Sequence, residues 1–335
     1  MVEPDRPARA PWLAWDWSAA LRGLCYAVPA AALLPIDLRI GVAAAVGVIP
    51  AAVLPLPPRR RGRLAIVLLG AVIGAAVLLG SVLATVPWLA VVGILVLSVG
   101  ATALAARHRP AMILVLLGLP LVGVGFSYVG AGASAPLALL FLAGSVYACA
   151  VAMLWPERPA PSAAGAAERA PPTPGYGVRL GLAAALCAGI GFALHFDHVG
   201  WATAAALLVM RSEGDVLSIR AIGRPVSVCV GALVAIALLT LRAPGWLVAL
   251  VVVLAVAAAT ATRASLWYVT PAFTTFMAFL LMLAADPTQA PGRFGERLGE
   301  TLLGVALAVV FGLLLPRLIP LVSRSPSGRR ERRGG

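Results

Sequence analysis

The chain has 335 residues, of which 61% are hydrophobic and 12% charged, and its mean hydropathy is +0.98. A soluble domain usually carries about 25% charged residues, so this composition excludes an ordinary soluble protein and indicates an integral membrane protein. The net charge is +13. The arginines cluster at the ends of apolar segments, as orientation signals do, so we give a nucleic-acid partner little weight.

The apolar segments are runs of Ala, Leu, Val and Gly, most of roughly 17 to 21 residues, close to the length that a helix needs to cross a bilayer. They lack the alternation of an outer-membrane barrel, so we predict α-helices. Twelve transmembrane helices are predicted, at 17–34, 40–56, 64–84, from Trp88 to Ala106, 111–128, up to Leu154, 178–194, 200–210, 224–241, 246–262, 266–284 and 298–315. The helix at 200–210 is short and is expected to be buried or tilted.

Residues 157–175 are rich in Pro, Ala and Ser, a composition typical of a flexible or extended tether. The first residues lack the cleavage site of a signal peptide, so the first helix is expected to stay in the protein. We therefore expect a cytoplasmic segment at 1–16, a six-helix membrane module at 17–156, the linker at 157–175, a second six-helix module at 176–320 and a basic cytoplasmic tail at 321–335.

The two halves share local patterns that predict a tandem repeat. Arg22 and Arg179 each open a first helix, and Arg63 and Arg224 each precede a glycine by seven residues. Further matches are Pro87-Trp88-Leu89 with Gly245-Trp246-Leu247, Ala101–Ala103 with Ala259–Ala261, and Leu154-Trp-Pro156 with Leu314-Leu-Pro316. Six helices is an even number, so both modules insert in the same orientation. The predicted fold class is an all-α polytopic membrane protein whose two modules enclose a central cavity.

The distribution of arginine predicts the orientation. Of the 26 arginines, 21 lie on the side of the N-terminus, four lie on the opposite side, and Arg22 lies within a helix. The positive-inside rule therefore places both termini and the linker in the cytoplasm. We expect the acidic residues of three connections to face outward, namely Asp37, Asp197 and Asp286. We expect the arginines of three other connections to face inward, namely Arg60, Arg109 and Arg211.

Several stretches of the second half together resemble the fusaric acid resistance (FUSC) or aromatic acid exporter type of integral membrane transporter. They are Arg179 at a helix start, Gly200-Trp201-Ala202-Thr203, Arg220 and Arg224 followed by Gly231, Arg263 with Tyr268-Val-Thr270-Pro271, and Arg297-Leu-Gly-Glu300-Thr301-Leu-Leu-Gly304. The first half keeps the topology but departs in detail, since Ala43 stands roughly in the place of Trp201.

The resemblance implies a six-helix module, doubled here, in a family that contains exporters of aromatic and other organic acids driven by the proton-motive force. Related plant malate channels make anion conduction a theme of the family. Many relatives carry a large cytoplasmic domain, in whose place this chain has only the linker and the tail. We predict a bacterial inner-membrane transporter that moves organic anions outward by proton antiport. A passive anion channel and a non-transporting scaffold with a lipid- or partner-binding tail are the alternatives.

Nine residues are candidates for the transport site. Arg179, Trp201, Thr203, Arg220, Arg224, Thr270, Arg297 and Thr301 are substrate or pore candidates, and Glu300 is the candidate for proton coupling. The arginines are interpreted either as headgroup anchors or as an electropositive vestibule, with Arg224 favoured because a helix start attracts anions. Arg297 and Glu300, one turn apart, form either an interfacial ion pair or a gate. Thr270-Pro271 either breaks its helix to line a cavity or simply kinks it.

No motif for catalysis is present, so we expect no enzyme activity and no cofactor. The four cysteines, Cys25, Cys149, Cys187 and Cys229, lie singly in apolar spans and are interpreted as small buried hydrophobic residues. His195-Phe-Asp197-His198 contains three residues of types that bind metals, but the sequence offers no fourth ligand. We therefore favour the interpretation that these side chains form a solvated cap on the turn between two helices. The expected partners are the lipid bilayer and a small organic anion, and a homo-oligomer is an alternative that the sequence leaves open.

Overall fold

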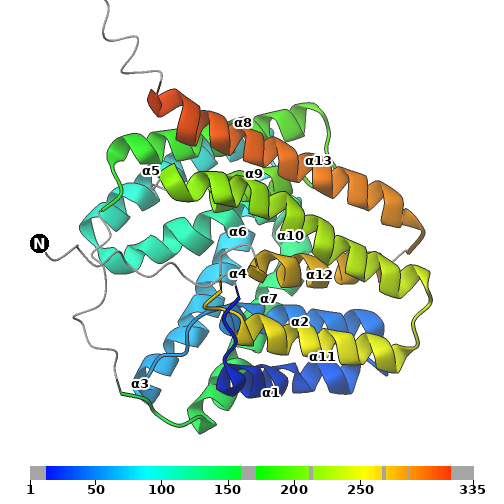
Figure 1. Cartoon of the computed structure of the whole chain (residues 1–335). Coiled ribbons are helices and arrows are strands. Elements are labelled where there is room, and N and C mark those ends of the chain that lie inside the picture. The colour runs from blue at the N-terminus through cyan, green and yellow to red at the C-terminus, as the bar shows by residue number, and fades with distance from the viewer. Residues whose placement is uncertain (1–12, 160–170, 211–213, 266–268, 285–286, 318–335) are drawn as a thin grey trace, which may run out of the picture.

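The structure is a computed structural model that describes residues 13–159, 171–210, 214–265, 269–284 and 287–317. These residues form helices joined by short connections, and no strand occurs among them (Figure 1). The predicted all-helical fold class is therefore confirmed. The tail and most of the linker lie outside the described residues, as do Arg211, Tyr268 and Asp286.

The helices follow the chain in two similar series. The first half contains α1 (Trp17–Leu33), α2 (Leu38–Val53), α3 (Arg60–Arg63), α4 (Ala65–Leu83), α5 (Pro87–Arg107), the short elements η1 (Arg109–Ala111) and η2 (Leu114–Gly118), α6 (Leu119–Gly125) and α7 (Ala131–Leu154). The second half contains α8 (Pro174–Ala193), α9 (Val199–Val209), α10 (Gly214–Thr240), α11 (Gly245–Ala261), α12 (Val269–Leu283), η4 (Pro287–Gln289), α13 (Ala290–Val309) and η5 (Val310–Leu314).

Side chains in the connections determine where several helices begin. Asp16 accepts a hydrogen bond from the backbone N–H of Ala19 at the start of α1, and Asp37 does the same for Ile40 in α2. Thr173 caps α8, whose first residue is a proline and so has no N–H to leave unpaired. Such caps satisfy donors that the first helical turn cannot pair internally, which is why apolar helices follow directly after these polar residues.

Most predicted helices are found within a few residues of their expected positions, but α10 and α13 begin much earlier. The helix predicted at 224–241 begins at Gly214, so Arg224 lies inside a 27-residue helix and not at its start. The prediction was wrong because the helix continues through Pro225, a residue that more often opens a helix. The helix predicted at 298–315 begins at Ala290, which places Arg297 two turns inside it.

Two other predicted elements also differ. α12 begins at Val269, so Pro271 lies in its first turn, where the missing N–H breaks no hydrogen bond. Within the described part of the chain, Thr270-Pro271 therefore lies at the start of α12 and interrupts no described helix. The single helix predicted at 111–128 is divided into a 3₁₀ turn, a π-helical turn and the short α6, with Pro120 at the start of α6.

The connections gather at two ends of the bundle. At one end, Asp16 before α1 contacts Arg263 after α11, with Nη2 of Arg263 3.4 Å from Oδ2. At the same end, the backbone N–H of Arg158 after α7 donates to the carbonyl of Pro58 at 3.2 Å. At the other end, Nε of Arg39 in α2 donates to the carbonyl of Ala284 after α12 at 3.2 Å. Figure 1 shows the α10–α11 connection and the start of α13 together at this second end, away from α3.

The main helix contacts within one half have counterparts in the other. α1 packs on α2 as α8 packs on α9, α2 on α7 as α9 on α13, and α4 on α6 as α10 on α12. Between the halves, α5 packs on α8 and α11 packs on α1. One apolar core joins α1, α2, α4 and α7 to α10, α11 and α12, and a second joins α5 and α6 to α8, α9 and α13. Helices of both halves therefore share each core.

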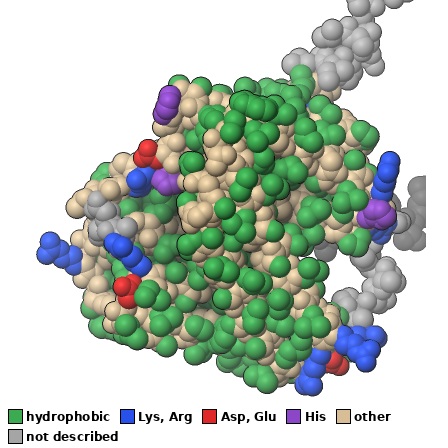
Figure 2. Space-filling model, turned by 180° about the vertical axis from the view of Figure 1, so that it is seen from behind, with side chains coloured by type: hydrophobic (Ala, Val, Ile, Leu, Met, Phe, Trp, Pro, Cys, Tyr) green, Lys and Arg blue, Asp and Glu red, His purple; other side chains and the backbone are tan. Residues whose placement is uncertain are grey.

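The outside of the bundle is apolar. Figure 2 shows a face covered by hydrophobic and uncharged side chains, with the charged side chains gathered at its two opposite edges. Large exposed side chains such as Leu68, Val96, Leu139 and Ile222 belong to this surface. Six helical segments are long and apolar enough to cross a membrane, namely Arg60–Leu83, Pro87–Arg107, Ala131–Leu154, Pro174–Ala193, Leu217–Thr240 and Ala290–Arg317. The other apolar helices in the described part are shorter than a standard span.

Candidate functional site

One face of α13 carries the densest group of polar side chains inside the bundle. Arg293 is followed on this face by Glu296, Arg297, Glu300 and Thr301, which lie three, four, seven and eight residues further along the helix. Residues so spaced lie on one side of an α-helix, because the helix repeats every 3.6 residues. This side of α13 faces α9 and α10, which both pack against the helix.

Small residues bring α13 very close to α9. An added Cβ atom at Gly304 would collide with the carbonyl of Ala202 and with the side chain of Ala205. The two backbones can approach in this way only because Gly304 has no side chain. The close contact fixes the polar face of α13 against the whole of the short helix α9.

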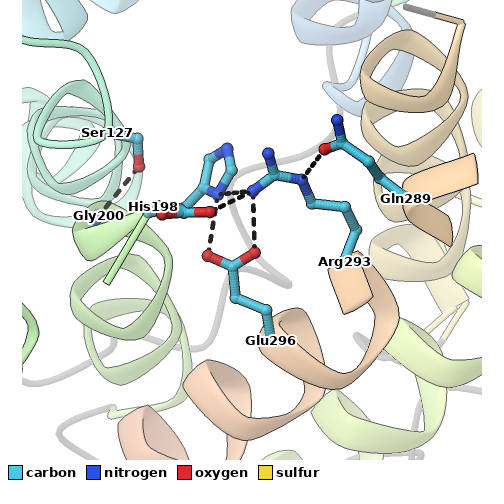
Figure 3. Close-up of polar contacts among 7 residues, drawn as sticks. Ser127, His198, Gly200, Gln289, Arg293 and Glu296 are labelled. Carbon is cyan, nitrogen blue, oxygen red and sulfur yellow. Dashed lines mark hydrogen bonds and ion pairs between the residues drawn. The ribbon is translucent and has the colours of Figure 1, made fainter. Parts of the chain in front are cut away.

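At the end of the bundle where α8 turns into α9, four charged or titratable side chains form a network (Figure 3). Nη1 of Arg293 lies 2.8 Å from Oδ2 of Asp197 and 3.1 Å from Oε2 of Glu296. Nδ1 of His198 lies 3.2 Å from Oε1 of Glu296. Nε of Arg293 also donates to the side chain of Gln289 at 3.1 Å. The network ties the α8–α9 turn to the first turns of α13.

An aromatic group lies one turn deeper. The guanidinium carbon of Arg297 is 3.2 Å from the ring centroid of Trp201. The indole also meets His198 edge to face, with ring centroids 5.6 Å apart, and Phe279 of α12 at 6.5 Å. A guanidinium over an indole face is held by the quadrupole of the ring, so Arg297 is positioned without a carboxylate partner.

Two arginines and one carboxylate form the centre of the site, in which Arg224 and Glu300 are buried and Arg297 is partly buried. Arg224 of α10 is 5% exposed and Glu300 of α13 is 3% exposed. Arg297 interacts electrostatically with both residues, but it forms no ion pair with Glu300. Nε of Arg224, Nε of Arg297 and Oε1 of Glu300 are buried and have no hydrogen-bond partner among the described residues. Two positive charges against one negative charge leave a net charge of +1 when Glu300 is ionised.

Arg220 continues the polar face toward the opposite end of α9. It precedes Arg224 by four residues on α10, so the two side chains share a face of that helix. Nη1 of Arg220 donates to the carbonyl of Leu208, near the end of α9, at 3.4 Å. Polar groups therefore follow α9 from the Leu208 end to the Asp197 end. We call this set the polar column: Arg220, Arg224, Glu300, Arg297, Trp201, Glu296, His198, Arg293 and Asp197.

The structure brings together five of the nine residues predicted for the site: Trp201, Arg220, Arg224, Arg297 and Glu300. Thr301 lies beside Glu300 on α13 and is fully buried, with its hydroxyl oxygen unpartnered among the described residues. The methyl group of Thr203 faces Gly123 of α6, away from Trp201. Arg179 lies near the start of α8, and Thr270 lies in the first turn of α12. No described contact joins either of them to the column.

Asp197, His198, Arg293 and Glu296 were missed as site residues. The first two were interpreted as a solvated cap, whereas in the structure they bind α13. The other two lay outside the predicted helix at 298–315. The signal that could have found them is the spacing of the polar residues from Arg293 to Thr301, which is that of a helix face. No group of three or more His, Cys, Asp or Glu residues is placed to hold a metal ion in the described ranges.

These features define a class of protein. Several apolar helices of membrane-crossing length, an apolar outer surface and charged residues at two edges are typical of a multi-pass membrane protein. In the second half of the chain, residues 186–311 match the family model described as Fusaric acid resistance protein-like. The resemblance predicted from the sequence is thereby confirmed over this region, which contains α9, α10, α11, α12 and α13. Comparisons with curated proteins and with solved structures found no match.

Proposed function

We propose that this chain is a membrane transporter that exports small organic acid anions, aromatic ones included, and that it binds them at Arg224, Arg297 and Trp201. The observation that carries the proposal is the meeting of two guanidinium groups, that of the buried Arg224 and that of the partly buried Arg297, with the carboxylate of Glu300 beside Trp201. The family match adds support, because it covers all four of these residues.

The site fits a monovalent carboxylate. The net charge of +1 is neutralised by one such anion, and a buried charge is costly until it is paired. The unpartnered Nε groups of Arg224 and Arg297 are donors that a carboxylate oxygen can accept from. Guanidinium groups pair with carboxylates through two parallel hydrogen bonds, which gives direction as well as charge. The indole of Trp201 and the ring of Phe279 offer apolar surface for the organic part of the anion.

We propose Glu300 as the group that couples export to protons. Its carboxylate competes with the anion for the same two arginines. At about 6 Å and an effective dielectric near 20, two unit charges interact by about 3 kcal/mol. A proton on Glu300 therefore strengthens anion binding, so the site favours joint occupancy by proton and anion. Antiport, in which a proton is exchanged for an anion, therefore requires Glu300 to release its proton in a different step of the transport cycle from the release of the anion.

We further propose that the two halves are tandem six-helix modules with twelve spans in the bacterial inner membrane and with both termini in the cytoplasm. The paired helix contacts of the two halves support the repeat, and the gathering of the connections at two ends supports the even number of spans. The excess of arginine on one side supports the orientation. In this orientation Arg220 lies at the cytoplasmic end of the polar column and Arg293 at the outer end.

Purified protein in proteoliposomes tests the transport proposal. The probe is radiolabelled 4-hydroxybenzoate, and empty liposomes give the leak. We expect protein-dependent exchange of the probe, and faster net efflux when a pH gradient is imposed. Exchange that equals the leak, for this probe and for a panel of aliphatic carboxylates, would contradict transport. Efflux that follows the anion gradient with no response to pH would instead identify a passive anion channel.

A further inference from the structure

The coupling proton needs a route to Glu300, whose side chain is almost completely buried. The side chains of His198 and Glu296, at the outer end of the polar column, are each 23% exposed and therefore reach water. Glu296 precedes Glu300 by four residues on the same face of α13, which places the two carboxyl groups one helical turn apart. Glu296 is therefore the acidic group of the column nearest to Glu300 along α13.

The hydrogen-bond geometry specifies where a proton is held in this network. Nδ1 of His198 lies 3.2 Å from Oε1 of Glu296 and 3.5 Å from Nη1 of Arg293. The guanidinium can only donate and the carboxylate oxygen can only accept, and the contact with Glu296 is the shorter one. Nδ1 therefore carries the hydrogen in this contact, which leaves the other ring nitrogen, Nε2, as the site that takes a proton from water. Glu296 in turn receives a hydrogen bond from Arg293 at 3.1 Å on its other oxygen.

The charges that surround the pair come from three elements. The α8–α9 turn contributes Asp197, α13 contributes Arg293, Arg297 and Glu300, and α10 contributes Arg224. Arg293 is shared between Asp197 and Glu296, so this outer group has two carboxylates and one guanidinium. Its net charge is −1 when His198 is neutral and zero when the imidazole is protonated. The outer end can therefore take up one proton without building up positive charge.

We propose that His198 and Glu296 form a proton relay between the outer water and Glu300. Water protonates Nε2 of His198, and the hydrogen on Nδ1 moves to Oε1 of Glu296, which leaves neutral imidazole. Glu296 then passes the proton to Glu300 through one water molecule, since carboxyl groups one turn apart, with Cβ atoms about 6 Å from each other, are too distant for direct transfer. The reverse order returns the proton. This relay rests on the proposed proton coupling at Glu300.

A merely structural role is the competing explanation, because the same network ties the α8–α9 turn to α13. The two roles differ in what they control. A structural tie sets stability and the rate of every transport mode, whereas a relay sets only the rate at which Glu300 gains or loses its proton. The variants E296Q and H198N remove the titratable groups and keep side chains that can still form hydrogen bonds.

Time-resolved infrared spectroscopy of the purified full chain after a pH drop tests the relay without depending on transport. The carbonyl band of protonated Glu300 is identified as the band that E300Q lacks. In E296Q and H198N we expect this band to appear at least tenfold more slowly than in wild type. The matched controls are E157Q, on an exposed carboxylate at the opposite end of the bundle, and H195N, on an exposed histidine of the same turn. Wild-type rates in both E296Q and H198N would overturn the relay.

Probe exchange and gradient-driven efflux in proteoliposomes separate this inference from the transport proposal. We expect E296Q to keep exchange of 4-hydroxybenzoate and to lose most of the acceleration by a pH gradient. Equal loss of exchange and acceleration, with lowered thermal stability, would assign a structural role and overturn the relay. E296D, which restores a carboxylate, should restore the acceleration. A wild-type protein without any exchange would refute transport, while the infrared rates would still decide the relay.

Discussion

The guanidinium carbon of Arg297 lies 3.2 Å from the centroid of the Trp201 ring, so the indole, and not Glu300, is the closest partner of this arginine. An arginine that is held by an aromatic face keeps its hydrogen-bond donors free for another acceptor. The contact therefore explains how a positive charge can be fixed inside the bundle without being neutralised. It also leaves the carboxylate of Glu300 without an ion-pair partner among the described residues.

Replacement of Trp201 tests this positioning. In W201A we expect exchange of 4-hydroxybenzoate to fall about thirtyfold, because the cation–π contact of a desolvated arginine is worth about 2 kcal/mol. W201F, which keeps a smaller aromatic face, should lose less. The control is W246A, since Trp246 is exposed at the start of α11 and should leave exchange unchanged. Equal exchange in W201A and wild type would remove the indole from the mechanism.

Arg224 carries the second positive charge of the site. The variant R224K tests whether the site needs a guanidinium group or only a positive charge. R224K keeps the charge but loses the planar pair of donors that fits a carboxylate. We expect R224K to insert normally and to exchange 4-hydroxybenzoate about tenfold more slowly, which is the effect of about 1.4 kcal/mol in transition-state binding. R107K at the exposed end of α5 is the matched control. Wild-type exchange in R224K would show that charge alone suffices.

The apolar segments made the helices predictable, because length and hydropathy are properties of the sequence itself. The starts of α10 and α13 could not be predicted in this way, since the sequence of polar residues near a helix end does not show whether they lie inside or outside the helix. Arg293 forms ion pairs with Glu296 of the same helix and with Asp197 of the α8–α9 turn. The first turns of α13 can therefore extend outward with their charges paired. This pairing depends on a contact between distant parts of the chain, which no local pattern contains.

The matches between the two halves of the sequence did not predict the roles of the matched residues. Arg63 and Arg224 were matched by their spacing from a glycine, yet they perform different tasks. Arg63 is fully buried and donates to the carbonyls of Pro57, Ala152, Trp155 and Pro156. It closes the C-terminal end of α7, whose last carbonyl groups have no partner within the helix. Arg224 has no such carbonyls in reach among the described residues and faces the polar column.

This difference makes Arg63 a test of stability and not of transport. In R63K one ammonium group replaces a fork that serves four carbonyls, and the unpaired acceptors each cost about 1–3 kcal/mol when buried. We expect the midpoint of thermal unfolding to fall by several degrees in detergent, while the protein that remains folded exchanges 4-hydroxybenzoate as wild type does. R60K, at the exposed start of α3, is the control. Unchanged stability in R63K would contradict a capping role.

The orientation can be tested with cysteines placed at the two ends of the bundle. Asp197 lies beside Arg293 at one end and is exposed, whereas Arg60 lies beside Glu157 at the other end. In a background without Cys25, Cys149, Cys187 and Cys229, a membrane-impermeant maleimide added outside whole cells should label D197C and spare R60C. Labelling of both after the cells are opened is the control. The reverse pattern would refute the orientation, and labelling of both in intact cells would refute an odd number of crossings between them.

The variant E300Q tests whether Glu300 couples transport to protons. In E300Q the carboxylate that competes for Arg224 and Arg297 is replaced by a neutral amide of the same shape. Wild-type binding of 4-hydroxybenzoate should tighten as the pH falls, because a proton on Glu300 removes a negative charge that opposes the anion. E300Q should bind tightly at every pH and should exchange the probe, but its net efflux should no longer respond to a pH gradient. Isothermal titration from pH 5.5 to 8.5 and efflux from proteoliposomes measure the two effects. If E300Q keeps the wild-type response to the pH gradient, the coupling proton is carried by another group and Glu300 only tunes the charge of the site.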